Sequence, residues 1–145
     1  MMTVKEVMTE KVHALRETDT LRDVRELMER QRIRHVPIVT RGKRFQGLVS
    51  HRDLLGATIS GLAGVDPDVR REIDSCISVK EIMRTDLRTV STSTPLKEAA
   101  SILLQNKYGC LPVVEDEVLV GIITEADFLK LTIELIEILG TRRGL

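Results

Sequence analysis

The chain reads Gly47-Leu48-Val49-Ser50-His51-Arg52-Asp53 and, 74 residues later, Gly121-Ile122-Ile123-Thr124-Glu125-Ala126-Asp127. The residues ahead of these stretches repeat as well: Val4-Lys5-Glu6-Val7-Met8 returns as Val79-Lys80-Glu81-Ile82-Met83, and Val36-Pro37 as Leu111-Pro112, both 75 residues on. Two copies of one unit in 145 residues predict two similar half-domains that pack with pseudo-two-fold symmetry. Equivalent loops would then lie side by side, so function is expected where the copies face each other.

Each copy carries the signals of the same series of elements. The patterns Thr3-x-x-Glu6 and Ser78-x-x-Glu81 are typical of capping boxes that open a short helix. A brief extended segment follows in each copy, and then an amphipathic helix. Strand-like runs rich in Val, Ile and Leu come next, at 36–39 and 45–49 in the first copy and at 111–114 and 119–123 in the second.

The predicted fold class is α/β (α+β), with two β-α-β-β-α repeats. Each repeat is expected to form a small three-stranded sheet covered by helices, the last of which begins at Ser50 or Thr124. We expect the first repeat and its linker to cover residues 1–77, and the second repeat with a long C-terminal helix to cover 78–145, together forming one module. The linker contains Gly61, Gly64 and Pro67 around a possible short helix at 68–73.

Composition excludes several classes of protein. Lys plus Arg equals Asp plus Glu at 22 each, so no overall field attracts nucleic acid or anionic lipid, and the short basic runs are expected to be solvated faces. Cys76 and Cys110 lack the spacing of a zinc site. Because the chain has neither a membrane-length apolar run nor the apolar stretch of a signal peptide, we expect a cytoplasmic protein that does not enter the membrane.

An enzyme is not expected. The three histidines, at 13, 35 and 51, have no metal-ligand spacing. There is also no Gly-rich phosphate loop of the Walker type and no nucleophile beside a plausible base. We therefore assign no catalytic residue and no metal ligand.

At this point the residues resemble a known family. Arg34-His35-Val36-Pro37-Ile38-Val39 leads to the first motif stretch, and Tyr108-Gly109-Cys110-Leu111-Pro112-Val113-Val114 leads to the second. This doubled pattern, over almost the whole chain, is similar to a tandem pair of CBS (cystathionine β-synthase-type) domains. The resemblance implies a regulatory module that binds adenosine-containing ligands, such as AMP, ADP, ATP or S-adenosylmethionine, in clefts between the repeats. It also implies a homodimer and no required cofactor.

The chemistry of the motifs agrees with such a ligand. A carboxylate can accept both hydroxyls of a ribose, which is the role expected of Asp53 and Asp127. The hydroxyls of Ser50 and Thr124 stand at predicted helix starts, where a phosphate is favoured. Adenine would lie between aliphatic residues, with free strand backbone bonding its polar edge; these residues are Val36, Pro37, Leu111 and Pro112.

Alternatives remain open at several of these residues. Ser50-x-x-Asp53 and Thr124-x-x-Asp127 also fit the capping box, and a hydroxyl can cap while the Asp binds. Arg34 and His35 are candidate phosphate contacts, or they complement a helix end and stay solvated. The basic surroundings of the first motif predict that its site tolerates more phosphate charge than the second.

Partners are the remaining expectation. The apolar surface predicted for the helix at 125–139 exceeds one contact, so part of it is expected to meet a second chain. A sensing module also needs an effector protein that responds to it. The alternative function is a dimerisation or docking scaffold that binds no ligand.

Overall fold

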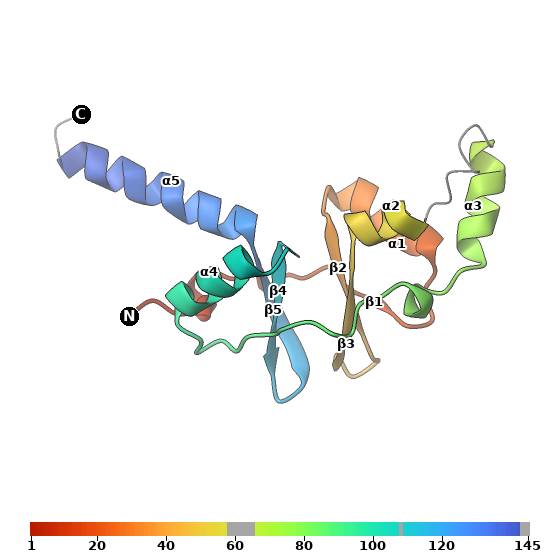
Figure 1. Ribbon diagram of the computed structural model, residues 1–145, viewed down its shortest axis with the longest axis horizontal. Coiled ribbons are helices and arrows are strands. Elements are labelled where there is room, and N and C mark those ends of the chain that lie inside the picture. Colours follow the sequence, from red (N-terminus) through yellow and green to blue (C-terminus); the bar gives the residue numbers. More distant parts are fainter. Residues whose placement is uncertain (58–65, 108, 143–145) are drawn as a thin grey trace. The chain divides into compact units, whose positions relative to one another are not determined.

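The computed structural model describes residues 1–57, 66–107 and 109–142 (Figure 1). Their elements are, in chain order, η1 (Val4–Glu6), β1 (Leu15–Arg16), α1 (Leu21–Gln31), β2 (His35–Val39), β3 (Phe45–Ser50), α2 (His51–Ala57), α3 (Pro67–Ser75), η3 (Val79–Glu81), α4 (Leu96–Gln105), β4 (Cys110–Glu115), β5 (Val118–Thr124) and α5 (Glu125–Arg142), where η marks a 3₁₀ helix. The mixed α/β class is confirmed, and so is the short helix in the linker, which is α3. Gly61 and Gly64 lie outside the described residues.

The chain divides into two compact units. The first, which we call the Ser50 unit, contains His13–Leu87 and Glu117–Leu119. The second, the Thr124 unit, contains Met1–Val12, Arg88–Asp116 and Val120–Leu145. Each unit therefore holds most of one sequence repeat together with a short segment of the other.

The Ser50 unit is built on a three-stranded sheet in the order β1-β2-β3. Strands β2 and β3 are antiparallel, with His35 opposite Ser50 and Pro37 opposite Leu48, and β1 runs parallel to β2. Helix α1 begins after Thr20, whose backbone amide donates to Asp23 Oδ2 at 2.8 Å. The apolar stripe of this helix packs on the sheet in a core formed by Leu21, Val24, Leu27, Met28, Val36, Ile38, Val49, Leu54 and Val79.

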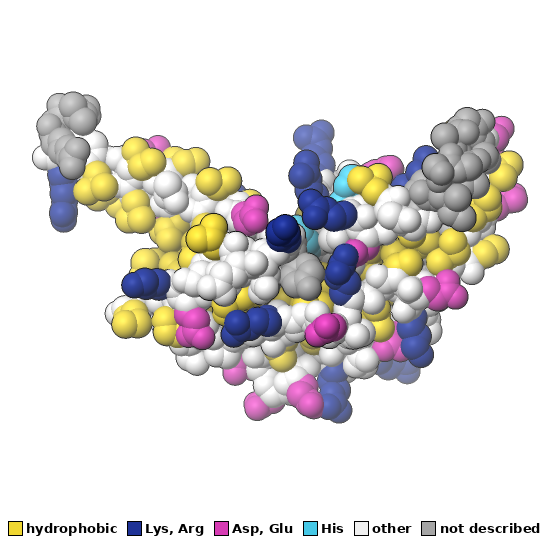
Figure 2. Space-filling model, in the orientation of Figure 1, with side chains coloured by type: hydrophobic (Ala, Val, Ile, Leu, Met, Phe, Trp, Pro, Cys, Tyr) yellow, Lys and Arg dark blue, Asp and Glu magenta, His cyan; other side chains and the backbone are white. Residues whose placement is uncertain are grey.

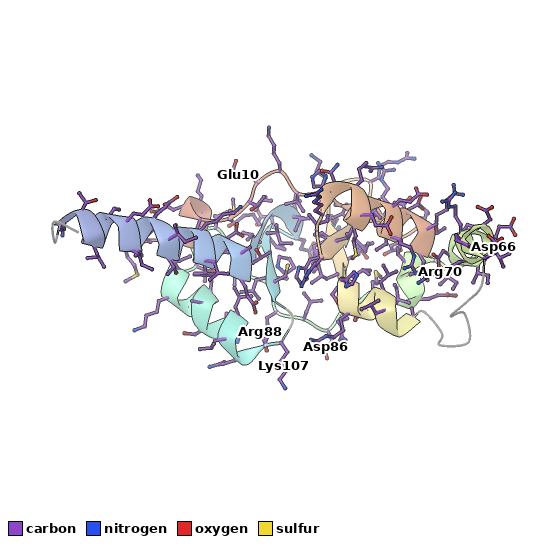
Figure 3. All side chains as sticks on the ribbon, turned by 90° about the horizontal axis from the view of Figure 1, so that it is seen from above. Glu10, Asp66, Arg70, Asp86, Arg88 and Lys107 are labelled. Atoms are coloured by element: carbon purple, nitrogen blue, oxygen red, sulfur yellow. The ribbon has the colours of Figure 1, made fainter. Side chains whose placement is uncertain are left out.

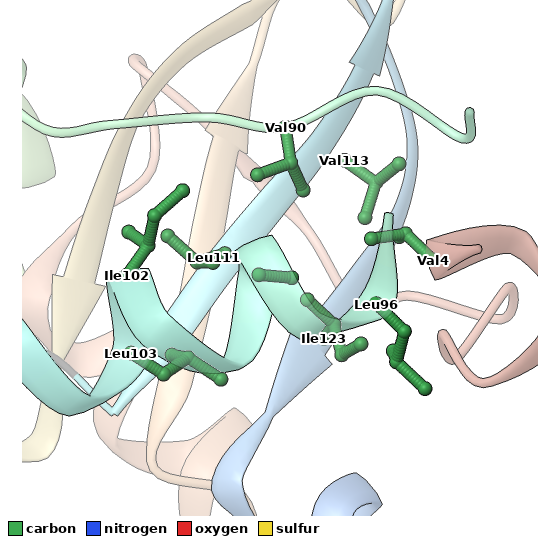
Figure 4. Close-up of a cluster of buried hydrophobic side chains, with 9 residues drawn as sticks. Val4, Val90, Leu96, Ile102, Leu103, Leu111, Val113 and Ile123 are labelled. Atoms are coloured by element: carbon green, nitrogen blue, oxygen red, sulfur yellow. The ribbon is translucent and has the colours of Figure 1, made fainter. Parts of the chain in front are cut away.

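The Thr124 unit has a smaller sheet than expected. Strands β4 and β5 pair, but the third strand is reduced to one parallel bridge between Val90 and Val113. The chain turns away directly after Val90, where the amide of Ser91 donates to the Thr94 hydroxyl oxygen at 3.0 Å, so no further residue pairs. The core, drawn in Figure 4, is formed by Val4, Val90, Leu96, Ala99, Ile102, Leu103, Leu111, Val113 and Ile123.

The first turn of each repeat packs in the unit of the other repeat. Val4, from η1, is fully buried in the Thr124 unit, where its amide donates to Thr94 O at 2.9 Å. Val79, from η3, is fully buried in the Ser50 unit, where its amide donates to Asp19 O at 3.0 Å. The repeats thus exchange their N-terminal turns, and this exchange brings new residues to the motifs.

The two turns are capped differently. The capping box predicted at Thr3 is present, with the Thr3 amide donating to Glu6 Oε1 at 3.1 Å. At Ser78 the hydroxyl oxygen accepts from the Lys80 amide at 3.2 Å and the hydroxyl donates to Glu17 O at 2.9 Å, in place of the predicted box. The Ser78 hydroxyl thus joins η3 to the neighbouring repeat, which a local pattern does not reveal.

Helix α5 extends from the end of β5 and carries an apolar surface, visible as the yellow side chains along α5 in Figure 2. Its exposed large hydrophobic residues are Leu129, Ile133, Leu135, Ile136, Ile138 and Leu139. Among the helices that the structure describes, none has the length and apolar character needed to cross a membrane.

Candidate functional site

Ser50 and Asp53 are joined by reciprocal hydrogen bonds where β3 ends and α2 begins. Asp53 Oδ2 accepts from the amide and from the hydroxyl of Ser50, both at 2.9 Å. The Asp53 amide in turn donates to Ser50 Oγ at 3.1 Å. The capping alternative is therefore confirmed at this motif, and it occupies one oxygen of the carboxylate.

The other oxygen of Asp53 faces a cation from the second repeat. Arg84 Nε lies 2.8 Å from Asp53 Oδ1. The Asp53 side chain is 9% exposed, whereas that of Arg84 is 47% exposed. Arg84 follows η3, so the exchanged turn delivers this guanidinium to the motif.

The second motif repeats this geometry with a neutral partner. Asp127 Oδ2 accepts from the Thr124 amide at 2.9 Å and from its hydroxyl at 3.3 Å. Asp127 Oδ1 accepts from the Thr9 hydroxyl at 3.1 Å, and Asp127 is 8% exposed. Thr9 follows η1 in the same way that Arg84 follows η3.

Arg84 and Thr9 stand at equivalent positions of the repeat, 75 residues apart, which we call the crossing position. Each is fixed by a two-way backbone bridge: Arg84 with Leu48, at 2.9 and 2.8 Å, and Thr9 with Ile122, at 3.0 and 2.8 Å. The analysis of the sequence missed both residues. The offset that they share was readable, but nothing local indicates that the turns are exchanged.

The motif glycines make room for this crossing. A Cβ atom on Gly47 would lie 2.8 Å from Arg84 O and 3.0 Å from Met83 Sδ. A Cβ on Gly121 would lie 2.7 Å from Met8 Sδ and 3.0 Å from Thr9 O. Since these distances are shorter than normal van der Waals contact, glycine allows the exchanged segment to lie against the strand.

The apolar candidates are buried on both faces of the sheets. Val36 and Leu111 belong to the two cores, beneath α1 and α4 respectively. Pro37 and Pro112 are buried as well, and alternation along a strand directs them to the opposite face. Any adenine in these sites would therefore meet the proline face, while Val36 and Leu111 support it from behind through the backbone.

The two basic candidates lie beside Ser50. His35 is half-buried and pairs with Ser50 in the β2–β3 register. Arg34 is exposed, and its carbonyl oxygen accepts from the His51 amide at 2.7 Å. The backbone thus holds Arg34 close to the start of α2, while its side chain is in solvent.

Cys110 occupies the position of the second repeat that corresponds to His35. It is fully buried, and burial together with the negative charge of Asp127 raises the pKa of its thiol well above the ordinary range. A protonated, buried thiol is a poor nucleophile. Within the described ranges, no group of three or more His, Cys, Asp or Glu side chains is placed to hold a metal ion.

The doubled motif, the exchanged turns and the two equivalent carboxylates define a tandem-repeat module. The family model for the CBS domain matches the chain twice, at residues 4–60 and 79–134. The chain belongs to the CBS domain family, and it has the tandem arrangement of a CBS pair.

Several relatives share this arrangement. The chain is 35% identical to the chloroplastic CBS domain-containing protein CBSX1 of Arabidopsis thaliana, covering 92% of this chain but 65% of that relative. A crystal structure of a putative acetoin utilization protein (AcuB) from Vibrio cholerae is similar with a TM-score of 0.82 and 41% identity, over 97% of each chain. The structure of Arabidopsis CBSX2 in complex with AMP is similar with a TM-score of 0.78 and 26% identity, over 93% of this chain and 98% of that one.

Proposed function

We propose that this chain is a regulatory module that binds adenosine-containing ligands at the Asp53 and Asp127 sites and transmits their occupancy as a conformational change. The observation that carries this proposal is the pair of nearly buried carboxylates, each with one oxygen facing only the crossing residue of the exchanged turn. The similarity to CBSX2, whose structure contains AMP, supports an adenine nucleotide as the ligand. The module itself catalyses no reaction in this proposal and needs no cofactor.

The hydrogen bonds at Asp53 indicate how a ribose would bind. A carboxylate offers about four lone pairs, and Asp53 accepts bonds from the Ser50 amide, the Ser50 hydroxyl and Arg84. A ribose that places both hydroxyls on Asp53 needs two acceptor positions. Its binding therefore displaces the Arg84 bond and, at Asp127, the equivalent bond from Thr9.

The other predicted residues complete the two sites. The proposed adenine surface consists of Pro37 and Pro112, backed by Val36 and Leu111. Arg34 and His35 are the proposed contacts for a phosphate in the Ser50 unit. The hydroxyls of Ser50 and Thr124 already bond the motif aspartates, so in this proposal they fix the carboxylates in addition to contacting the ligand.

Displacement of the crossing residues offers a route for the signal. Arg84 lies shortly before the chain leaves the Ser50 unit between Leu87 and Arg88. Thr9 lies shortly before it leaves the Thr124 unit between Val12 and His13. A ligand that moves either residue acts on a segment that connects the units, and it favours whichever arrangement fits it best. A partner protein that binds one arrangement would respond to the ligand.

Thermal unfolding with AMP, ADP, ATP, S-adenosylmethionine and a GMP control tests the proposal. A ligand at a hundredfold excess over its dissociation constant should add about 2.7 kcal/mol to the free energy of unfolding. Asp53→Asn and Asp127→Asn should each remove part of the ligand-dependent rise in the unfolding midpoint. Asp86→Asn is the control, because Asp86 is exposed and lies two residues beyond Arg84 (Figure 3).

The ligand-dependent shift is the readout, because Asp53→Asn also lowers the midpoint of the ligand-free protein by leaving Arg84 without its anion. A rise with adenine compounds and none with GMP supports the sensor. Protein freed of bound nucleotide that shows no rise with any compound refutes it.

A homodimer is the second part of the proposal, and the exposed apolar residues of α5 support it. The expected contact involves Ile133 and Ile136, which are 57% and 62% exposed. Changing both to Glu should shift sedimentation equilibrium toward the monomer, whereas Glu137→Gln on the same helix should leave the mass unchanged. If the double variant keeps the mass of the parent protein, α5 is not the dimer contact. A dimer that binds no adenine compound would favour the scaffold alternative.

A further inference from the structure

The crossing position is the point where the two sites differ most in charge. Asp53 faces a guanidinium and Asp127 faces a hydroxyl, although the rest of the hydrogen bonding is the same. We propose that Arg84 and Thr9 set the charge of the ligand that each site accepts: the Ser50 unit takes anionic adenosine ligands, and the Thr124 unit takes neutral or cationic ones. This inference rests on the proposed function and concerns the selectivity of the same sites.

Displacement has different consequences at the two carboxylates. When ribose hydroxyls take Asp53 Oδ1, Arg84 loses its anion, and its planar guanidinium remains charged at any physiological pH. A phosphate on the same ligand supplies a new anion, which guanidinium groups bind with two parallel hydrogen bonds. Adenosine supplies none, so its binding at Asp53 includes the cost of breaking an ion pair. A mobile, 47% exposed arginine side chain can turn from the carboxylate to the phosphate.

Thr9 makes no such demand. Its hydroxyl can leave Asp127 and bond a ribose oxygen or water without any change in charge. The hydrogen bonds that Asp127 accepts come from Thr124 and Thr9, which are neutral groups, so its negative charge has no cation bonded to it. An uncompensated, nearly buried carboxylate repels a phosphate and attracts a positive centre such as a sulfonium.

The surroundings of the two motifs have charges of the same sense. His51 and Arg52, which follow Ser50, are both exposed, whereas exposed Glu125 follows Thr124. The residue after Thr9 is Glu10, which is exposed on the loop that follows η1 (Figure 3), and the equivalent residue after Arg84 is Thr85. The neighbouring side chains therefore reinforce the difference made at the crossing position.

Exchanging the crossing residues tests the inference. The Ser50 site is isolated by Asp127→Asn and the Thr124 site by Asp53→Asn, and calorimetry measures the ratio of AMP to adenosine affinity at each. At the Ser50 site Arg84→Thr should lower this ratio by about tenfold or more, because it removes a charge-assisted contact to the phosphate. Arg84→Lys keeps the charge and should retain most of the preference. At the Thr124 site Thr9→Arg should raise the ratio by a similar factor.

The outcomes separate this inference from the function beneath it. Affinity ratios that do not change in either exchange, in variants that still bind adenosine, overturn the role of the crossing position and leave the proposed function standing. A wild-type protein that binds neither AMP nor adenosine overturns both. If Arg84→Thr does not fold, the ratios of Arg84→Lys and Thr9→Arg decide, and an unchanged ratio in Thr9→Arg overturns the inference. The AMP preference of the Ser50 site should also decline as salt is added, whereas adenosine binding should not.

Discussion

Replacing Gly47 by alanine is expected to destabilise the protein, because the new methyl group would collide with the exchanged segment. Its Cβ would lie 2.8 Å from Arg84 O, which is about 0.6 Å inside ordinary contact. That oxygen accepts the Leu48 amide at 2.9 Å, so it cannot retreat without weakening the bridge. Overpacking of this kind costs about 1–3 kcal/mol. Alanine also restricts the unfolded chain, which offsets about 0.4–1 kcal/mol of the loss.

Gly121→Ala is the matched variant in the second repeat, and its cost should be smaller. The nearest atom to its Cβ is Met8 Sδ at 2.7 Å, which belongs to a flexible side chain that can rotate. The nearest backbone atom, Thr9 O, is 3.0 Å away and needs to move less. Chemical denaturation of both variants measures the difference in the free energy of unfolding.

The expected order is wild type, Gly121→Ala, then Gly47→Ala, with a net loss of about 1–2 kcal/mol at Gly47. For a chain of this size each kcal/mol lowers the unfolding midpoint by about 2–4 °C. Equal stability of Gly47→Ala and the wild type would refute the close crossing at Arg84. A larger loss at Gly121 than at Gly47 would refute the distinction between backbone and side-chain obstruction.

Three further predictions concern single residues. Arg32→Gly should raise the free energy of unfolding by about 1 kcal/mol in denaturant titrations, because Arg32 ends α1 in the left-handed region at φ 54°. Burial and the charge of Asp127 raise the pKa of Cys110, so stability that is present below its ordinary pKa of about 8.5 should fall as the pH rises above it, and Cys110→Ala should show a flatter alkaline decline in melting temperature. Hydrogen bonds from Thr92 lower the pKa of Glu115, so their contribution is present above the ordinary pKa of Glu and is lost as the pH falls through the lowered one. Thr92→Val should therefore make acid unfolding depend less on Glu115, which NMR titration of that carboxyl would reveal as a pKa nearer its ordinary value.

Most elements of the fold could be predicted because their signals are local. The stripe of α1, the Thr20 cap and the strands around Pro37 and Pro112 each follow from residues a few positions apart. The extended segment ending at Val90 also had a strand-like pattern, but the turn held by Thr94 limits it to one bridge. Pairing of that kind depends on tertiary contacts, which periodicity does not report.

The candidate site could be predicted only in part, for a related reason. The bonds between Ser50 and Asp53 join residues three apart, so the motif reveals them. The bonds to the crossing residues join positions 31 apart at Asp53 and 118 apart at Asp127. The sequence repeat relates Arg84 to Thr9 but does not indicate which motif either residue meets. That information lies in the exchange of η1 and η3.

The exchange also separates the two properties that a ligand site needs. The motif in each repeat fixes the carboxylate, through bonds from Ser50 or Thr124 that are the same in both units. The charge facing that carboxylate comes from the other repeat, as Arg84 or Thr9. A substitution at the crossing position can therefore change ligand preference without disturbing the cap that orders the Asp. Since the same residue is attached to a segment that connects the units, the group that selects the ligand is also the group that moves when it binds. In a sensor built this way, selectivity and signal should change together, and Arg84→Lys should preserve both.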